Sequence, residues 1–146
     1  MLAIFVFHNR TRHRFMNLFT FSRDFKHVDV YIYNVQFNMW IGFRTGRDGI
    51  TYSLSNIEDS SKLINKLSEI KEINHIIGVQ IRYRAYFPWI PLTIPMCNEF
   101  ARMITGINVG FTWNPCNLYN KLLKYDGKRN YDIFFTWRRE DGVFRR

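Results

Sequence analysis

The stretch that decides the fold is HVDVYIY, residues 27–33, in which apolar and polar side chains alternate. Its positions divide into two sets, Val28, Val30 and Ile32 in one and His27, Asp29, Tyr31 and Tyr33 in the other. Successive side chains of a β-strand point to opposite faces, so this pattern predicts a strand with one apolar face.

Two further strands are predicted directly after this stretch. NMWIGFR, residues 38–44, follows a short connection, and the turn RTGRDGI then leads into ITYSL, residues 50–54. Glycine and charged residues at that turn favour a tight reversal of the chain. We therefore expect three adjacent strands in an antiparallel meander, with strands 27–33 and 38–44 paired.

The rest of the chain supplies helices to cover this sheet. Ser55 and Glu58 have the spacing of a capping box, which predicts a helix with the apolar stripe Leu63, Ile64, Leu67 and Ile70. Asn114 and Pro115 have the residue types of a helix N-cap and first helical residue. HIIGVQIRYRAYF and YDIFFTW are read as strands. The predicted class is α+β, an antiparallel meander with a cysteine-bearing helix and two further helices packed on it.

The composition indicates one domain covering residues 1–146. A hydrophobic content of 47% excludes a disordered chain. The opening MLAIFVF is too short to span a bilayer and is predicted to be a first strand, so we expect a soluble protein. Residues 1–26 form a basic N-terminal strand and loop in this prediction, and residues 138–146 form a basic tail that we expect to be flexible.

The net charge of +9 is concentrated at the two ends of the chain. Residues 1–26 hold five Lys/Arg and one Asp, residues 121–146 hold eight Lys/Arg and four Asp/Glu, and residues 27–120 hold eight and seven. Basic ends serve solubility or docking onto an anionic surface. Arg10, Arg12 and Arg14 are therefore candidates for binding nucleic acid or an acidic protein.

Cys97 is the second residue of MCNEFARMITGINVG, residues 96–110, the stretch on which a functional interpretation depends. Phe100, Met103, Ile104 and Ile107 recur at helical spacing behind it, so a short helix should begin near Cys97. A thiol in a first helical turn lies beside unpaired backbone N–H groups, which favour the nucleophilic thiolate. The alternative is a thiol that merely packs in the core.

A nucleophilic thiol needs a neighbouring imidazole. His27, at the start of a central strand, is the first candidate, and His75 is the second. His8 and His13 are assigned to the basic loop and are less suited to a rigid site. Neither the spacing of Cys97 and Cys116 nor that of the histidines suggests a metal site, and no cofactor motif is present, so we expect no metal and no cofactor.

Three segments resemble the circularly permuted papain-like cysteine hydrolases, a group that includes the lecithin-retinol acyltransferase-like proteins and many bacterial and phage amidases and peptidases. KHVDVYIYN is similar to the histidine strand and PMCNEFARMITGI to the nucleophile helix. TWNPCNLYNKLLKY is similar to the helix that follows in small phage-type members. The resemblance spans roughly residues 27–125.

The resemblance implies that Cys97 is the nucleophile and His27 the general base. Members of the group usually place a third, imidazole-orienting group on the next strand, where this chain offers only Asn38. If Tyr33 and Asn38 flank the hairpin turn, His27 lies opposite Arg44 and far from Asn38. Asp29 shares the face of His27 two residues along, and the third member is left unassigned.

Two functions follow from these observations. The first is a phage-encoded thiol hydrolase, amidase or acyltransferase that acts on a peptide, amide or ester through Cys97 and His27. The second is a basic, non-enzymatic virion or nucleic-acid-binding protein, including a degenerate papain-like fold. Either protein would function in the host cytoplasm or in the virion.

Overall fold

The computed structural model describes residues 1–9, 25–46, 49–57, 59–85, 97–140 and 144–145. Its strands form one antiparallel sheet in the order β4-β3-β2-β1-β5-β6-β7. The elements are β1 (Leu2–His8), β2 (His27–Asn34), β3 (Met39–Gly46), β4 (Gly49–Ser55), α2 (Ser60–Ser68), β5 (Ile73–Ile81), α3 (Cys97–Thr105), α4 (Pro115–Lys124), β6 (Tyr131–Arg138) and β7 (Phe144–Arg145). The predicted α+β class and the β2-β3-β4 meander are confirmed.

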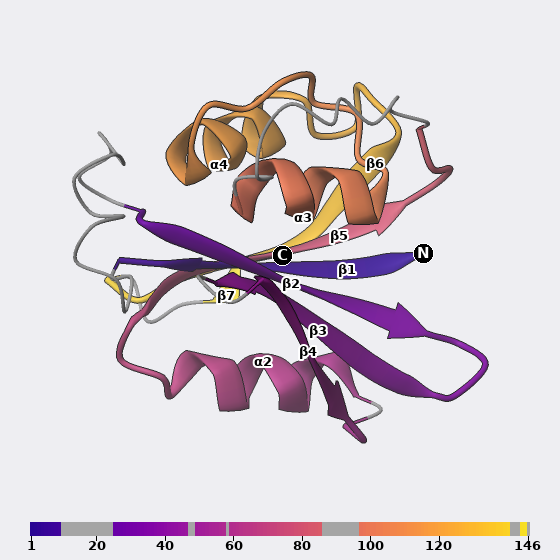
Figure 1. Cartoon of the computed structure of the whole chain (residues 1–146), viewed down its shortest axis with the longest axis vertical. Helices are drawn as coiled ribbons and strands as arrows, with labels where there is room; N and C mark the ends of the chain where they lie inside the picture. Colours follow the sequence, from indigo (N-terminus) through magenta and orange to yellow (C-terminus); the bar gives the residue numbers. More distant parts are fainter. Residues whose placement is uncertain (10–24, 47–48, 58, 86–96, 141–143, 146) are drawn as a thin grey trace.

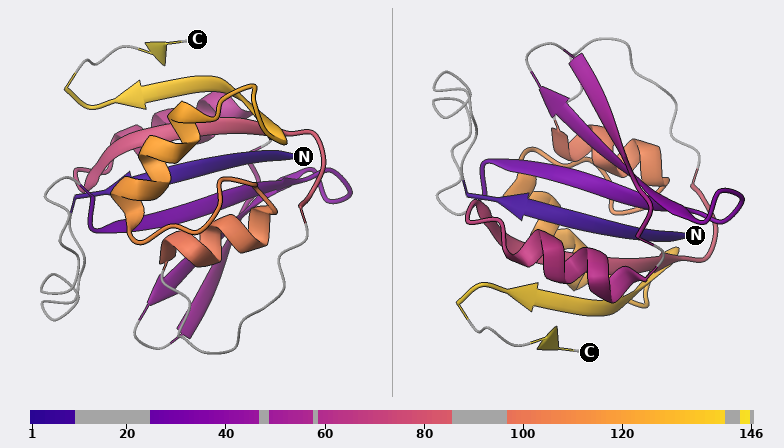
Figure 2. Two further views of the ribbon diagram at one scale, coloured as in Figure 1. Left: turned by 90° about the horizontal axis from the view of Figure 1, so that it is seen from above. Right: turned by 90° about the horizontal axis from the view of Figure 1, so that it is seen from below.

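The helices cover both faces of the sheet, α3 and α4 on one and α2 on the other (Figure 1; the two views of Figure 2). The larger core lies under α3 and α4, where Phe5, Val30 and Val79 meet Ala101 and Leu118. The smaller core lies under α2 and includes Ile4, Trp40, Ile76 and Leu67 of the described residues. The alternation of residues 27–33 therefore separates two buried layers, with Val28 and Val30 facing α3 and Tyr31 and Tyr33 facing the α2 side.

Two helix starts test the capping predictions. Asn114 caps α4 by accepting a hydrogen bond from the Asn117 backbone N–H at 2.8 Å, and Pro115 is the first helical residue, as predicted. The predicted start of the earlier helix at Ser55 is wrong, because β4 runs to Ser55 and the side chain of Asp59 caps α2 instead. Glu58, the other half of the predicted capping box, lies outside the described residues.

The register between β2 and β3 differs from the prediction by two residues. Asn34 pairs with Met39, so the connection has four residues, and Tyr33 pairs with Trp40 rather than with Asn38. Asn38 adopts a left-handed backbone with φ of 50° and closes the turn. The strand therefore begins at Met39 and not at the predicted Asn38. This shift moves Arg44 away from His27 and level with Asp29.

The sheet around His27 is built differently on its two sides. β1 pairs with β2 as far as His8 and His27. In the described residues, the β2–β3 ladder ends at Val30 and Phe43, although both strands continue beyond that pair. Among the described strands, β1 is therefore the one that pairs through its backbone with the first residues of β2.

A glycine in β5 makes room for aromatic rings of the neighbouring strand. A Cβ at Gly78 would stand 2.6 Å from the Phe134 ring and even closer to the ring of Phe135. We expect Gly78→Ala to lower the free energy of unfolding by about 2 kcal/mol. Gly78 lies at a β-bulge, and the two packed rings cannot both move aside to admit the added methyl group. Urea unfolding monitored by tryptophan fluorescence measures this loss.

The matched control for this prediction is Gly46→Ala at the end of β3. A Cβ there would have its nearest neighbour at 3.9 Å, so the substitution should leave the midpoint almost unchanged. Equal midpoints for both variants and the original protein would contradict the close packing at Gly78.

Several sequence predictions concern residues that the structure does not describe. Arg10, Arg12, Arg14 and His13 of the basic loop lie outside the described residues, as do residues 86–96 with their proline-rich run and residues 141–143 of the tail. Residues 144–145 of that tail form β7 beside β6. None of the described helices has both the length and the apolar character needed to cross a membrane.

Candidate active site

His27 and Cys97 are brought together by the packing of α3 on the sheet. His27 is the first residue of β2, and Cys97 is the first residue of α3. The helix rests on the strands through Phe100, whose ring centroid lies 6.4 Å from that of Phe43 in β3. Cys97 lies close enough to His27 for its side chain to raise the pKa of the imidazole, although the two residues are far apart in the chain. The predicted contact between helix 97–105 and the strand of His27 is thus present.

Asp29 is the group that orients the imidazole. Its carboxylate is almost fully buried, and Oδ1 accepts a hydrogen bond from Nε2 of His27 at 2.7 Å. With Nε2 directed at Asp29, Nδ1 is the ring nitrogen left for the thiol. A thiol, an imidazole and a carboxylate therefore lie in sequence, which is the arrangement that activates a cysteine nucleophile.

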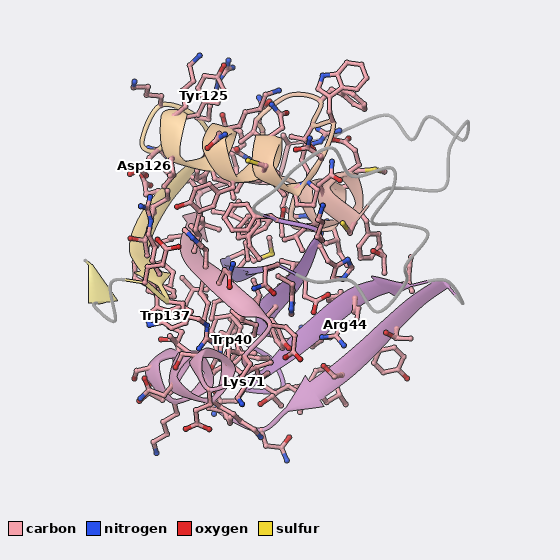
Figure 3. All side chains as sticks on the ribbon, turned by 90° about the vertical axis from the view of Figure 1, so that its left-hand side faces the viewer. Trp40, Arg44, Lys71, Tyr125, Asp126 and Trp137 are labelled. Carbon is pink, nitrogen blue, oxygen red and sulfur yellow. The ribbon has the colours of Figure 1, made fainter. Side chains whose placement is uncertain are left out.

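The other carboxylate oxygen of Asp29, Oδ2, accepts hydrogen bonds from two further side chains. Oδ2 accepts hydrogen bonds from Nε2 of His8 at 3.0 Å and from Nε and Nη2 of Arg44 at 2.9 and 2.7 Å. His8 is buried, and its ring centroid lies 5.7 Å from that of His27. Figure 3 shows Arg44 on the strands, far from Tyr125 and Asp126 at the end of α4. All the donors around Asp29 come from the first three strands.

The pKa values of this group follow from burial and from these contacts. Burial works to lower the pKa of His27, but hydrogen bonds with Asp29 and Cys97 and the charges of both residues raise it to about 9. Burial works in the opposite direction on Asp29, yet hydrogen bonds from His27, His8 and Arg44 hold its pKa well below the ordinary range. At neutral pH the site therefore contains an imidazolium between Cys97 and an ionised carboxylate.

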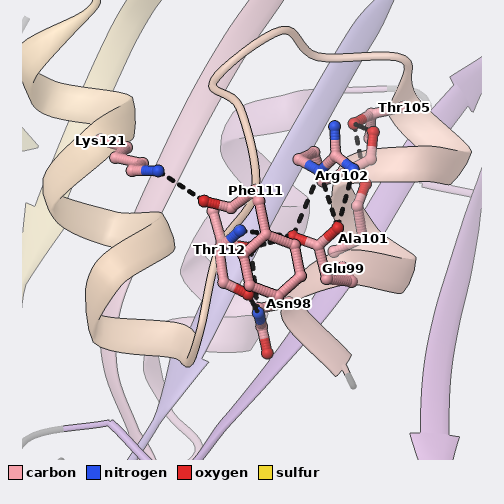
Figure 4. Close-up of polar contacts among 8 residues, drawn as sticks. All are labelled: Asn98, Glu99, Ala101, Arg102, Thr105, Phe111, Thr112 and Lys121. Carbon is pink, nitrogen blue, oxygen red and sulfur yellow. Dashed lines mark hydrogen bonds and ion pairs between the residues drawn. The ribbon is translucent and has the colours of Figure 1, made fainter. Parts of the chain in front are cut away.

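The first turn of α3 is fixed by a buried polar network (Figure 4). Nδ2 of Asn98 donates to the carbonyl and hydroxyl oxygens of Thr112 at 2.6 and 2.9 Å. Glu99 accepts from the backbone N–H of Thr112 at 2.7 Å and pairs with Arg102 at 2.7 Å. Arg102 is thus the ion-pair partner of Glu99, the one acidic residue in the first turn of α3.

The other sequence candidates belong to different surroundings. Nδ1 of His75 lies 3.0 Å from the hydroxyl oxygen of Tyr119, and its ring packs edge-on against Phe25. Cys116 packs against the larger core from α4, and its sulfur accepts a hydrogen bond from Asn120. Both cysteines are free thiols. Cys97 is accordingly the thiol that shares an imidazole with a carboxylate.

The run RYRAYF, residues 82–87, alternates basic and aromatic side chains, and its two arginines have structural roles. Nη2 of Arg82 donates to the carbonyl of Gly127 at 3.3 Å, and Nη2 of Arg84 donates to the carbonyl of Ile104 at 2.9 Å. Both guanidinium groups thus tie the end of β5 to neighbouring turns. Tyr83 beside them is exposed.

Three members of the site were not assigned from the sequence. The sequence places Asp29 on the face of His27 without indicating its role, predicts His8 in a basic loop, and aligns Arg44 with His27 through a register that is two residues off. A carboxylate inside an apolar strand is the signal that was available, because a buried charge needs partners. His8 ends β1 and is buried instead of lying in a loop.

No group of His, Cys, Asp and Glu side chains within the described ranges is placed to hold a metal ion. No protein-family model, curated protein or solved structure matches this chain. The chemistry therefore has to be inferred from the residues of the site.

Proposed function

We propose that this protein is a thiol hydrolase or acyltransferase in which Cys97 is the nucleophile, His27 carries the proton and Asp29 positions His27. The observation that supports this most strongly is the proximity of Cys97 to the His27 ring, whose Nε2 is held by Asp29 at 2.7 Å. Each of these residue types is needed for an activated cysteine, and each lies within reach of the next.

The reaction would proceed through an acyl-enzyme. The thiolate of Cys97, beside the imidazolium of His27, attacks the carbonyl carbon of an amide or ester; a C–S bond forms, the C–N or C–O bond breaks, and His27 gives its proton to the departing amine or alcohol. Water then loses a proton to His27 and attacks the thioester, so the C–S bond breaks, the acid is released, and the thiolate and imidazolium are restored. An alcohol or amine in place of water would make the same site an acyltransferase.

The resemblance to the permuted papain-like hydrolases supports the same assignment. The chain order of a histidine strand, a cysteine helix and a following Pro-started helix agrees with that group. The position of the carboxylate departs from it, since Asp29 lies on the strand of His27 itself. In this proposal the carboxylate and the imidazole come from the same strand, two positions apart.

The alternative is a basic, non-enzymatic protein of a virion or one that binds nucleic acid. It rests on the net charge of +9 and on Arg10, Arg12 and Arg14, which lie outside the described residues. Binding that weakens steeply with added salt would favour this alternative, because phosphate contacts release counterions.

The proposed function is tested by alkylation of single-thiol variants. Cys116→Ser leaves Cys97 as the one thiol, and Cys97→Ser leaves Cys116. At pH 6, where an ordinary thiol with a pKa of about 8.5 is scarcely ionised, we expect iodoacetamide to label Cys97 at least about tenfold faster than Cys116. Mass spectrometry of timed samples gives both rates.

Two histidine variants sharpen this experiment. In the Cys116→Ser protein, His27→Gln should reduce the labelling rate of Cys97 to that of Cys116, because the imidazolium is lost. His75→Gln is the matched control and should leave the rate unchanged, since His75 contacts Tyr119. Equal labelling of the two cysteines in the folded protein would refute the nucleophile assignment.

A further inference from the structure

Strand β4 is an open edge of the sheet next to the candidate site. Within the described part of the chain, β3 is its one strand neighbour, and almost all of its side chains are exposed. Three large apolar side chains stand at alternate positions: Ile50 is 53% exposed, Tyr52 73% and Leu54 59%. An edge strand also presents a row of backbone N–H and C=O groups that can pair with another extended chain.

A chain of contacts joins the apolar row of β4 to the helix that carries Cys97. Tyr52 pairs with Phe43 across β3, and paired residues share a face of the sheet. The Phe43 ring lies 6.4 Å from that of Phe100, and Phe100 is three residues after Cys97 on the same side of α3. Exposed apolar surface on β4 is thus continuous with the face of α3 that carries the thiol.

A pocket lies between β4 and the pair of Asp29 and Arg44. It has a volume of about 160 Å³, and its lining combines Asp29 and Arg44 of the site with Thr51, Tyr52 and Ser53 of β4. Gly42 keeps this region open, because a Cβ there would stand 2.6 Å from the Tyr31 ring and 2.7 Å from Ser53 Oγ. Because Gly42 pairs with Tyr31 and with Ser53, this part of the pocket lies on the α2 side of the sheet, whereas Tyr52 shares the opposite face with Phe43.

We propose that β4 binds the substrate of Cys97 as an added strand, and that this substrate is an extended peptide with apolar side chains at alternate positions. The inference rests on the proposed function of Cys97 and His27. Backbone groups of the edge would pair with the peptide, and Ile50, Tyr52 and Leu54 would contact every second side chain. A fatty acyl chain could use the apolar row but not the backbone edge, so the two features together favour a peptide.

Three thiol-directed chloromethyl ketone probes test the proposal in the Cys116→Ser protein. The first is acetyl-Val-Thr-Val-Ala-chloromethyl ketone, the second is the same peptide with alternate amide nitrogens methylated, and the third is acetyl-Ala-chloromethyl ketone. We expect the first probe to label Cys97 at least about tenfold faster than either of the others. Methylation removes the donors of strand pairing while the side chains stay the same.

Variants of β4 locate the binding surface. Tyr52→Thr should slow labelling by the first probe about fivefold and leave labelling by iodoacetamide unchanged, because threonine keeps a strand conformation but lacks the ring. Tyr83→Thr is the matched control, since Tyr83 is also exposed but lies after β5, and it should change neither rate.

The outcomes separate this inference from the function on which it rests. Slow iodoacetamide labelling of Cys97 would overturn the proposed function itself. Fast iodoacetamide labelling with no preference for the unmethylated peptide would overturn the peptide surface alone. A dimer in sedimentation equilibrium that Tyr52→Thr converts to a monomer, with no effect on peptide labelling, would show that β4 pairs with a second copy of the chain instead.

Discussion

Replacing Asp29 by asparagine should slow iodoacetamide labelling of Cys97 by about a hundredfold at pH 6 and lower the free energy of unfolding by about 3 kcal/mol. The carboxylate accepts hydrogen bonds from His27, His8 and Arg44 within 3.0 Å and is 3% exposed. Asparagine has no charge to offer three donors, so the imidazole loses both its orientation and the charge that keeps it protonated.

The pH dependence of this stability difference follows from the lowered pKa of Asp29. A carboxylate whose pKa falls on folding stabilises the protein above its ordinary value of 3.8, and that contribution disappears as the pH falls. The difference in unfolding free energy between the original protein and Asp29→Asn should therefore shrink below about pH 4. Urea unfolding at pH 7 and at low pH measures it.

Asp132→Asn is the control for Asp29→Asn. Asp132 pairs with Arg82 at 3.4 Å on the surface, with 46% of its side chain exposed, and exposed pairs contribute little to stability. Both stability and labelling rate should stay the same in that variant. Unchanged labelling in Asp29→Asn would show that the carboxylate has no role in activating the thiol.

Much of the fold can be read from local patterns in the sequence. The alternation of Val28 and Val30 with Asp29 gives β2, and the Asn114-Pro115 pair gives the start of α4. These features depend on neighbours in the chain, which is why a sequence alone carries them. The helix at Ser60 shows the limit, because two acceptable caps lie within five residues and tertiary packing selects Asp59.

The site could be predicted only in part, because its members come from β1, β2, β3 and α3. Cys97 and His27 were found from residue type and position, but the role of Asp29 depends on the register of two strands. The turn has four residues, as expected, but it begins one position later, at residue 35, which places Arg44 beside Asp29, and no local pattern specifies that position. His8 reaches Asp29 because β1 pairs with β2 to its last residue.

The contacts of His27 affect the proposed chemistry by raising the pKa of its imidazole. Burial opposes the imidazolium, whereas hydrogen bonds with Asp29 and Cys97 and their charges stabilise it, so the pKa reaches about 9. A group whose pKa rises from 6.5 to about 9 on folding stabilises the protein fully below pH 6.5, and this contribution is lost as the pH rises through 9. The imidazolium is also the acid that the departing group needs, so hydrolysis should decline above that pH.

The measurement that tests the central claim most directly is the NMR titration of the His27 ring, with its signal assigned by His27→Gln. The expected midpoint is about 9 in the original protein. In Cys97→Ala the midpoint should fall clearly below that value, because the interactions of the Cys97 side chain with the ring are removed while the desolvation of the ring remains. Cys116→Ala should leave it at about 9. A midpoint near 6.5 in the original protein, or one that Cys97→Ala does not change, would contradict a shared proton between His27 and Cys97.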